Sequence, residues 1–358
     1  MIERLHLDKM LLYALLALSA LSLVVIYSAS GKSLNATAAH AVRLLLGFGV
    51  LLVCAQIRPE TLERWSPVVF GVGLALTLAV LALGVIGKGA QRWLSLGVLR
   101  FQPSEIMKLA VPMMLAWLFA REGLPPRLWR VAVGLLVTLV PVAIIAKQPD
   151  LGTAALVFAG GIIVIFLAGL SWRVIAPFLA LAAAAMPFAW HFMHDYQRQR
   201  ILTLFDPQSD PLGRGYHTIQ SMIAVGSGGF YGKGWLNSSQ AHLDYLPESH
   251  TDFIFAVFAE EFGLIGSVLL VGLYGFIVTR CLWIAYMAQD TYTRLLAGGL
   301  ALAFFIHFFI NMGMVVGILP VVGIPLPILS YGGTSIVTLM AAFGMLMAIH
   351  THRKIVEA

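Results

Sequence analysis

Residues 10–28 read MLLYALLALSALSLVVIYS and contain no charged side chain. A helix needs roughly 20 predominantly apolar residues to cross a hydrocarbon core of about 30 Å, and this run has that length. No convincing small-residue cleavage site follows the run, so we interpret it as a retained span rather than a signal peptide. The stretch therefore predicts a protein embedded in a membrane.

The composition extends this prediction to the whole chain. Hydrophobic residues make up 59% of the 358 positions and charged residues 11%, and the mean hydropathy is +0.88. Soluble domains carry about 25% charged residues. Because lipid offers no hydrogen-bond partners to the backbone, each apolar run is expected to be a helix. The expected fold is all-α, a polytopic membrane protein of about ten transmembrane helices with one long extracytoplasmic loop. The expected spans are 10–28, 38–56, 66–86, 103–120, 129–146, 151–170, 174–192, 252–279, 295–317 and 328–349.

The basic residues of the loops predict the orientation. An even number of spans leaves both termini on one side, and twelve of the 23 Lys and Arg residues fall on that side, against five in the opposite short loops. This asymmetry predicts cytoplasmic termini. The net charge of +6 is spread over many short loops, so it indicates membrane topology and no nucleic-acid partner. Cys54 and Cys281 have no partners at metal-ligand spacing, and we expect both to be inert.

We expect residues 1–358 to form a single membrane domain. Residues 193–251, between the seventh and eighth spans, are its long loop on the extracytoplasmic side. The loop is rich in Gly, Pro, Ser and Asp, yet it contains Trp235 and the nearly apolar stretch Ile219–Val225. Loops of this length are usually functional or disordered. The aromatic and apolar residues favour an ordered element that lies against the membrane.

His250, Thr251 and Asp252 lead into the eighth span. Thr or Asp before an apolar helix is commonly the N-cap, whose side chain accepts hydrogen bonds from free N–H groups. A carboxylate at the external surface, beside a histidine and after a glycine-rich loop, also suits a general base facing a polar substrate. The residues by themselves leave both interpretations open, with capping the commoner role.

Glu260 and Glu261 follow in the same span. Glu260 lies about 80° round the helix from Asp252 and Glu261 about 180°, so the three carboxylates cannot line one pocket. Acidic side chains inside a membrane face protein or water because exposure to lipid is costly. We interpret Glu260 and Glu261 as structural or coupling residues.

The fourth span begins at Pro103, a residue that suits the first helical turn, so Gln102 lies at the external rim. Glu105 and Lys108 are three residues apart and can pair. An isolated Lys inside a bilayer costs about 2.5–3.5 kcal/mol. We therefore favour a polar cavity under the external surface over an ion pair that only steadies the helix. Arg43 in the second span resembles this case, although its side chain can also reach the membrane edge.

Two external turns carry further polar residues. Arg92 and Trp93 place a cation beside an aromatic ring, which is either an ordinary interfacial tryptophan or a contact for phosphate or sugar. Arg100 follows on the same side. Asp150, in the run Lys147-Gln148-Pro149-Asp150, is expected to cap the sixth span.

Residues 311–335 predict an irregular backbone at the level of the membrane. They contain prolines at 320, 325 and 327 and the glycine pair Gly332-Gly333. Such backbone is tolerated only where protein or water covers it. A plain kinked turn is the simplest interpretation. The sequence contains no zinc, P-loop or nucleotide-binding motif, which argues against an ATP-driven machine.

Three motifs together resemble the signature of the SEDS family (shape, elongation, division and sporulation proteins), bacterial membrane proteins with ten helices. These motifs are Asn311 to Ser335, Gln102-Pro103-Ser104-Glu105, and the stretch LPESHTDFIF at 246–255. Other stretches resemble the elongation branch of the family rather than the division branch. They are GYHTIQS at 215–221, GKGW at 232–235 and KQPD at 147–150.

The resemblance implies a peptidoglycan glycosyltransferase that polymerises lipid II for cell elongation and rod shape, at the outer face of the bacterial cytoplasmic (inner) membrane. The aspartate that the family requires for activity falls on Asp252. The family's other functional positions fall on Trp93, Gln102, Glu105 and Lys108. The implied partners are a class B penicillin-binding protein, which is a transpeptidase, other elongation-complex proteins and membrane lipid.

The expected reaction joins two lipid-linked sugars by inverting transfer, with Asp252 as the base and undecaprenyl pyrophosphate as the leaving group. Candidate substrate-binding residues beside the family positions are Arg43, Arg100 and His250, and a divalent cation, Mg or Mn, is the expected alternative source of positive charge. A lipid II flippase is the rival interpretation, because many spans and intramembrane charges suit a transporter equally well. A scaffold that only recruits a synthase would leave Glu105 and Lys108 unexplained.

Overall fold

The computed structural model describes residues 5–87, 90–96, 99–170, scattered positions between 176 and 208, and residues 214–242, 245–246 and 249–352. Within these ranges eight helices are long and apolar enough to cross a membrane, and α6 is a shorter apolar helix. Nine of the ten expected spans are helices, and the seventh, 174–192, lies almost entirely outside the described residues. The nine are α1 (Lys9–Ala29), α2 (Leu34–Ala55), α3 (Pro59–Leu83), α4 (Pro103–Ala120), α5 (Leu128–Lys147), α6 (Leu151–Leu167), α11 (Ile254–Tyr286), α12 (Thr291–Val315) and α13 (Thr334–Thr351). The fold class is confirmed: the protein is a multi-pass membrane protein.

The third, eighth and tenth expected spans differ most from the structure. Helix α3 begins at Pro59 rather than residue 66, and α11 continues to Tyr286 rather than ending at residue 279. The third was expected to reach residue 86, but α3 ends at Leu83 and three short strands follow it, β1 (Val85–Gly87), β2 (Ala90–Leu96) and β3 (Leu99–Phe101). These strands form a small antiparallel sheet in the order β1-β2-β3, so their backbone groups pair with one another. The tenth was expected to begin at residue 328, but α13 begins only after Gly332 and Gly333, at Thr334.

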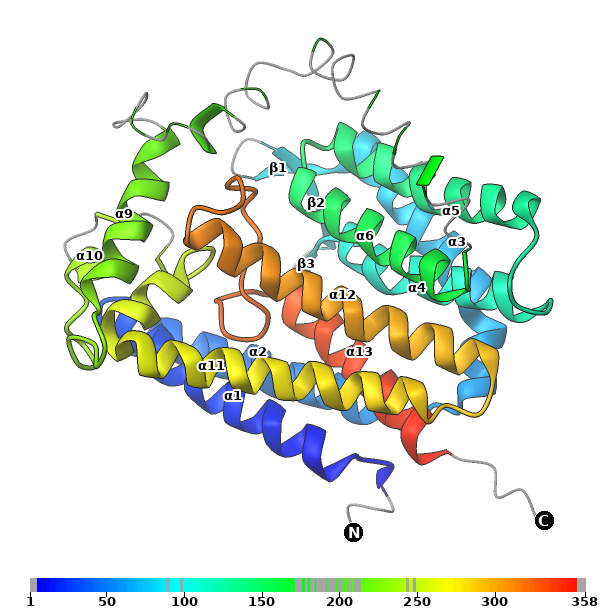
Figure 1. Cartoon of the computed structure of the whole chain (residues 1–358), viewed down its shortest axis with the longest axis horizontal. Helices are drawn as coiled ribbons and strands as arrows, with labels where there is room; N and C mark the ends of the chain where they lie inside the picture. The colour runs from blue at the N-terminus through cyan, green and yellow to red at the C-terminus, as the bar shows by residue number, and fades with distance from the viewer. Residues whose placement is uncertain are drawn as a thin grey trace.

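Helices α12 and α13 lie in the middle of the bundle (Figure 1), between α1 and α11 on one side and α4 and α6 on the other. Helix α13 packs against α2, and α12 packs against α11, α6 and α4. Helices α4, α12 and α13 are the most buried of the membrane-spanning helices, whereas most residues of α2, α3 and α5 are only partly buried or exposed. Polar residues on α4, α12 and α13 are therefore shielded from lipid.

Residues 6–8 and 350–352, near the two ends of the chain, meet at one end of the bundle. His6 stacks on His352 with ring centroids 3.8 Å apart. Asp8 caps α1 by accepting a hydrogen bond from Leu11 N (2.8 Å), pairs with Arg280 of α11 (2.5 Å) and lies 3.3 Å from His350 of α13. Burial by itself would raise the pKa of Asp8, but its hydrogen bonds and the charge of Arg280 lower that pKa below the ordinary value. One carboxylate thus joins three helices at this end.

Helix α11 is broken at Gly263, whose backbone (φ 63°, ψ −161°) is not helical. The break frees the carbonyls of residues 260 and 261, which accept hydrogen bonds from the N–H groups of Lys233 and Gly234, both at 3.0 Å. In return, Leu264 N and Ile265 N donate to the carbonyls of residues 229 and 230 at 2.8 and 3.2 Å. The loop after α9 (Arg214–Ser227) therefore replaces the hydrogen bonds that the helix loses, as a membrane-level break requires.

The two acidic side chains at the break hold the same loop. The Glu260 carboxylate is fully buried and accepts hydrogen bonds from Lys233 Nζ (2.6 Å), Ser238 Oγ (2.5 Å) and Ser239 Oγ (2.7 Å). Glu261 accepts from the N–H of Leu236 (3.2 Å) and from the hydroxyl of Ser28. These contacts support the structural interpretation of both residues.

We expect Gly263→Ala to destabilise the protein. Its φ and ψ lie in a region that is essentially restricted to glycine, where another residue costs about 1–3 kcal/mol, and a Cβ would lie 2.3 Å from Gly232 N. The matched control is Gly272→Ala in the same helix, where a Cβ meets nothing within 4 Å. Thermal unfolding in detergent should show a Tm lower by several degrees for the first variant and no loss for the second. Equal Tm values would contradict the role of the break.

Candidate functional site

Asp252 lies in the turn just before α11 and is half-buried. Helix α11 begins at Ile254, and its N-cap position is occupied by Phe253, whose side chain makes no capping hydrogen bond. The interpretation of Asp252 as the N-cap residue is therefore wrong, because the turn from 250 to 253 delays the helix. The carboxylate lies close to Gly323, where a Cβ would be 3.3 Å from Asp252 Oδ2.

The backbone of this turn is held by the loop between α12 and α13, residues 316–333, called here the α12–α13 loop. The N–H of Tyr331 donates to the carbonyl of His250 (2.9 Å), and Ser330 Oγ donates to the carbonyl of Thr251 (2.6 Å). The third carbonyl, that of Asp252, accepts from Asn311 Nδ2 of α12 (2.8 Å). Three consecutive carbonyls are thus fixed by three different residues, and the turn has a defined position.

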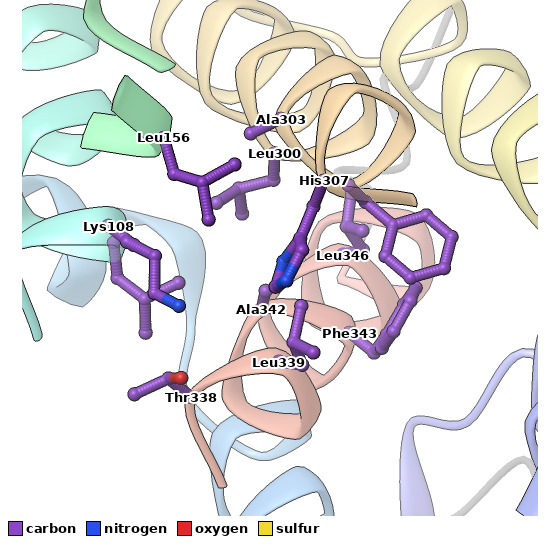
Figure 2. Close-up of a pocket in the computed structure, with 12 residues that line it drawn as sticks. Lys108, Leu156, Leu300, Ala303, His307, Thr338, Leu339, Ala342, Phe343 and Leu346 are labelled. Atoms are coloured by element: carbon purple, nitrogen blue, oxygen red, sulfur yellow. The ribbon is translucent and has the colours of Figure 1, made fainter. Parts of the chain in front are cut away.

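Glu105 and Lys108 form the expected pair on α4. Lys108 Nζ lies 2.6 Å from Glu105 Oε2, and Thr338 Oγ1 of α13 donates to the same oxygen at 3.0 Å. Lys108 also lines a cavity of about 40 Å³, and its side chain points across this cavity toward His307 (Figure 2). The cavity has room for a few water molecules, and apolar side chains such as Leu156 make up most of its wall. The structure therefore contains the ion pair, but the cavity beside it is mostly apolar and differs from the polar cavity that the sequence predicted.

Asp150 organises the polar turns at the start of α4 and α6. It accepts a hydrogen bond from Thr153 N (3.2 Å) and so caps α6, as the sequence predicts. Its other oxygen, Oδ2, accepts from Gln102 Nε2 (2.6 Å), and Arg92 Nη1 lies 3.8 Å from Oδ1, the oxygen that caps the helix. Gln102 and Arg92 are thus engaged with Asp150. Trp93 is half-buried on β2, opposite Val85.

Arg43 and His250 are far apart in the sequence but meet at one aromatic ring. The guanidinium carbon of Arg43 lies 4.1 Å from the ring centroid of Tyr331, and His250 packs edge-on to the same ring at 5.7 Å. His40 also stacks on it at 5.9 Å. Arg43 Nη1 is buried and has no hydrogen-bond partner among the described residues. This cluster therefore presents a cation with unused hydrogen-bonding capacity beside the Asp252 turn.

Several residues of this arrangement were not singled out by sequence reasoning. Tyr331, Ser330 and Thr338 lie in or near the Ser-Tyr-Gly-Gly stretch, and that irregular stretch was the only signal that pointed to them. The side chain of Arg100 lies outside the described residues. Over the described part of the chain, no group of three or more His, Cys, Asp or Glu could hold a metal ion.

We expect Lys108→Met to lower the Tm by several degrees, because it leaves the buried Glu105 carboxylate without its cation. The double variant Glu105→Gln/Lys108→Met removes both charges and should recover most of the Tm. If the pair serves the chemistry, the double variant should still lack the glycan-polymerising activity that the family resemblance implies. If the double variant recovered both stability and activity, the pair would have only a structural role.

Comparisons with known proteins give one consistent result. Residues 8–355 match the model of the FtsW/RodA/SpoVE family, described as "Cell cycle protein". The chain is 52% identical to the "Peptidoglycan glycosyltransferase MrdB" of Escherichia coli (strain K12), over 99% of this chain and 96% of that protein. It is 37% identical to the "Probable peptidoglycan glycosyltransferase FtsW" of Trichlorobacter lovleyi, over 97% and 94% of the two chains.

Solved structures agree with these relatives. A chain from the work titled "Structural coordination of polymerization and crosslinking by a peptidoglycan synthase complex" has a TM-score of 0.84 and 34% identity, and the match covers 96% of this chain and 97% of that one. The rod shape determining protein RodA of Thermus thermophilus has a TM-score of 0.73 and 29% identity, over 97% and 98% of the two chains. These matches confirm the resemblance drawn from the motifs. The chain belongs to the FtsW/RodA/SpoVE family of cell cycle proteins.

Proposed function

We propose that this protein is a peptidoglycan glycosyltransferase that polymerises lipid II into glycan strands for cell elongation and rod shape. The observation that carries the proposal is the fixed turn of Asp252, a half-buried carboxylate whose backbone is held by Asn311, Ser330 and Tyr331. The 52% identity to an enzyme named peptidoglycan glycosyltransferase supports the same reaction. The 52% identity to the MrdB of Escherichia coli, against 37% to the FtsW of Trichlorobacter lovleyi, supports the elongation branch.

In the proposed reaction, Asp252 takes the proton from the 4-hydroxyl of the GlcNAc of an incoming lipid II. The oxygen attacks the anomeric carbon of the growing chain, and the bond from that carbon to undecaprenyl pyrophosphate breaks. The donor sugar is α-linked and the product β-linked, so a single inverting displacement suffices. A hydroxyl is only weakly acidic, and a positioned base is worth about 10²–10⁴-fold in rate.

The pyrophosphate that leaves needs a cation near it. Lys108 is already paired with Glu105, and Arg92 is engaged with Asp150 and with the carbonyl of Gln148. Arg43 has a buried nitrogen with no hydrogen-bond partner among the described residues, which favours Arg43 for this role. A divalent cation, Mg or Mn, is the alternative source of positive charge, and the pyrophosphate would supply oxygen ligands of its own.

The proposed topology places both termini in the cytoplasm and the Asp252 turn on the extracytoplasmic side of the inner membrane. The contacts of His6 with His352 and of Asp8 with His350 support termini on one side, and the excess of basic residues at that end supports the orientation. The solved complex named for polymerization and crosslinking supports a transpeptidase partner, a class B penicillin-binding protein.

Asp252→Ala tests the proposal. The purified variant, given lipid II in detergent together with its transpeptidase partner, should make glycan strands at least about 10²-fold more slowly than the parent protein, because no base takes the proton. Glycan length is measured on gels, and an unchanged Tm shows that the variant is folded. Near-normal polymerisation would refute the role of Asp252. Detergent has no second leaflet, so a lipid II flippase would yield no strands from the parent protein either.

A further inference from the structure

Asn311 is a fully buried residue of α12 that joins two segments distant in the sequence. Its Nδ2 donates one hydrogen bond to the carbonyl of Asp252 (2.8 Å) and one to the carbonyl of Ile324 (2.6 Å). An amide nitrogen carries two hydrogens, so both are used. The opposite amide orientation would place Oδ1 against two carbonyl oxygens, which cannot donate. The orientation of Asn311 is therefore determined by its neighbours.

The α12–α13 loop is held by other buried side chains that do not touch the Asp252 turn. Tyr274 of α11 donates its hydroxyl hydrogen to the carbonyl of Pro327 (2.6 Å), and His307 Nε2 lies 3.0 Å from the carbonyl of Pro325. Loss of either contact would free one loop carbonyl, that of Pro327 or Pro325, and would leave the three hydrogen bonds to the Asp252 turn in place. Asn311 differs because it contacts both the loop and the residue whose carboxylate is the proposed base. Asn311 hydrogen-bonds directly to the backbone of Asp252.

We infer that Asn311 is a positioning residue for Asp252, an inference that rests on the proposed function. Asn311 donates hydrogen bonds from one nitrogen to the carbonyls of Asp252 and Ile324. These two bonds fix the position of the Asp252 carboxylate relative to Gly323. Without Asn311, the part-buried carbonyl of Asp252 and the buried carbonyl of Ile324 lose this donor, and the turn before α11 can move relative to the loop. A displacement of about 1 Å at a reacting group can cost on the order of 10²-fold in rate.

The test compares Asn311→Ala, Asn311→Asp and Tyr274→Phe in the full chain with its transpeptidase partner. Polymerisation rates are measured against lipid II concentration and pH, together with the Tm of each variant. Asn311→Ala should lower kcat about 10- to 100-fold with KM within about twofold, and should move the acidic limb of the pH profile. Asn311→Asp is nearly isosteric but presents oxygen to two carbonyls, so it should lose at least as much.

Tyr274→Phe is the matched control. It removes one buried hydrogen bond to the same loop, so it should lower the Tm by a comparable amount while kcat and the pH profile stay within about twofold of the parent. If Asn311→Ala behaves like Tyr274→Phe, the positioning role is wrong. If Asn311→Asp retains full kcat, the two donated hydrogen bonds do not matter and the inference also fails.

The outcome for Asp252→Ala separates this inference from the proposed function. An inactive Asp252→Ala with a fully active Asn311→Ala overturns only the positioning role. An active Asp252→Ala overturns the proposed base itself, whatever the Asn311 variants do.

Discussion

Backbone groups that leave a helix at membrane depth must find hydrogen-bond partners in the protein, since hydrocarbon offers none. This constraint acts most strongly at the break of α11 at Gly263 and in the α12–α13 loop. The break is satisfied by backbone groups of residues 229–234, and the loop by side chains of Tyr274, His307 and Asn311. The Asp252 turn stands between them, because α11 runs from that turn to the break. Its position therefore depends on the course of α11 and on the three hydrogen bonds that Asn311, Ser330 and Tyr331 donate to its carbonyls.

Ion pairs inside the bundle connect elements that are separate in the sequence. Asp8 with Arg280 ties α1 to α11, Glu260 with Lys233 ties α11 to the long loop, and Asp150 with Arg92 ties α6 to β2. Glu105 with Lys108 lies within α4, but Thr338 connects the pair to α13. A buried ion that lost its partner would be strongly destabilising, so these pairs constrain how the helices pack.

The same pairing indicates which groups are available to a substrate. Gln102 and Arg92 make contacts with Asp150, and the cavity beside Lys108 has room for water but not for a sugar. Arg43 stacks on Tyr331, a residue whose own backbone holds the His250 carbonyl. A cation and a carboxylate are thus brought to one place by the α12–α13 loop. Substrate entry on the scale of two lipid-linked sugars then requires space beyond the small cavity of this conformation.

Much of this protein was determined by local sequence. Apolar runs of spanning length predicted nine helices that the structure describes, because in lipid a helix is the only structure that satisfies its own backbone. The cap at Asp150, the pair of Glu105 and Lys108 three residues apart, and the irregular backbone after Asn311 follow from equally local rules. The resemblance to the family motifs favoured Asp252 as the residue required for activity.

Only the tertiary structure decided what the polar residues touch. Helical spacing could not show that Asp252 precedes the helix in a turn, since the turn exists because residues 311, 330 and 331 bind its three carbonyls from more than 50 positions away. It likewise could not show that Glu260 and Glu261 hold a loop across a helix break, or that Arg43 and His250 share the ring of Tyr331. Local patterns specify which segments are helices, whereas contacts between distant segments depend on how those helices pack.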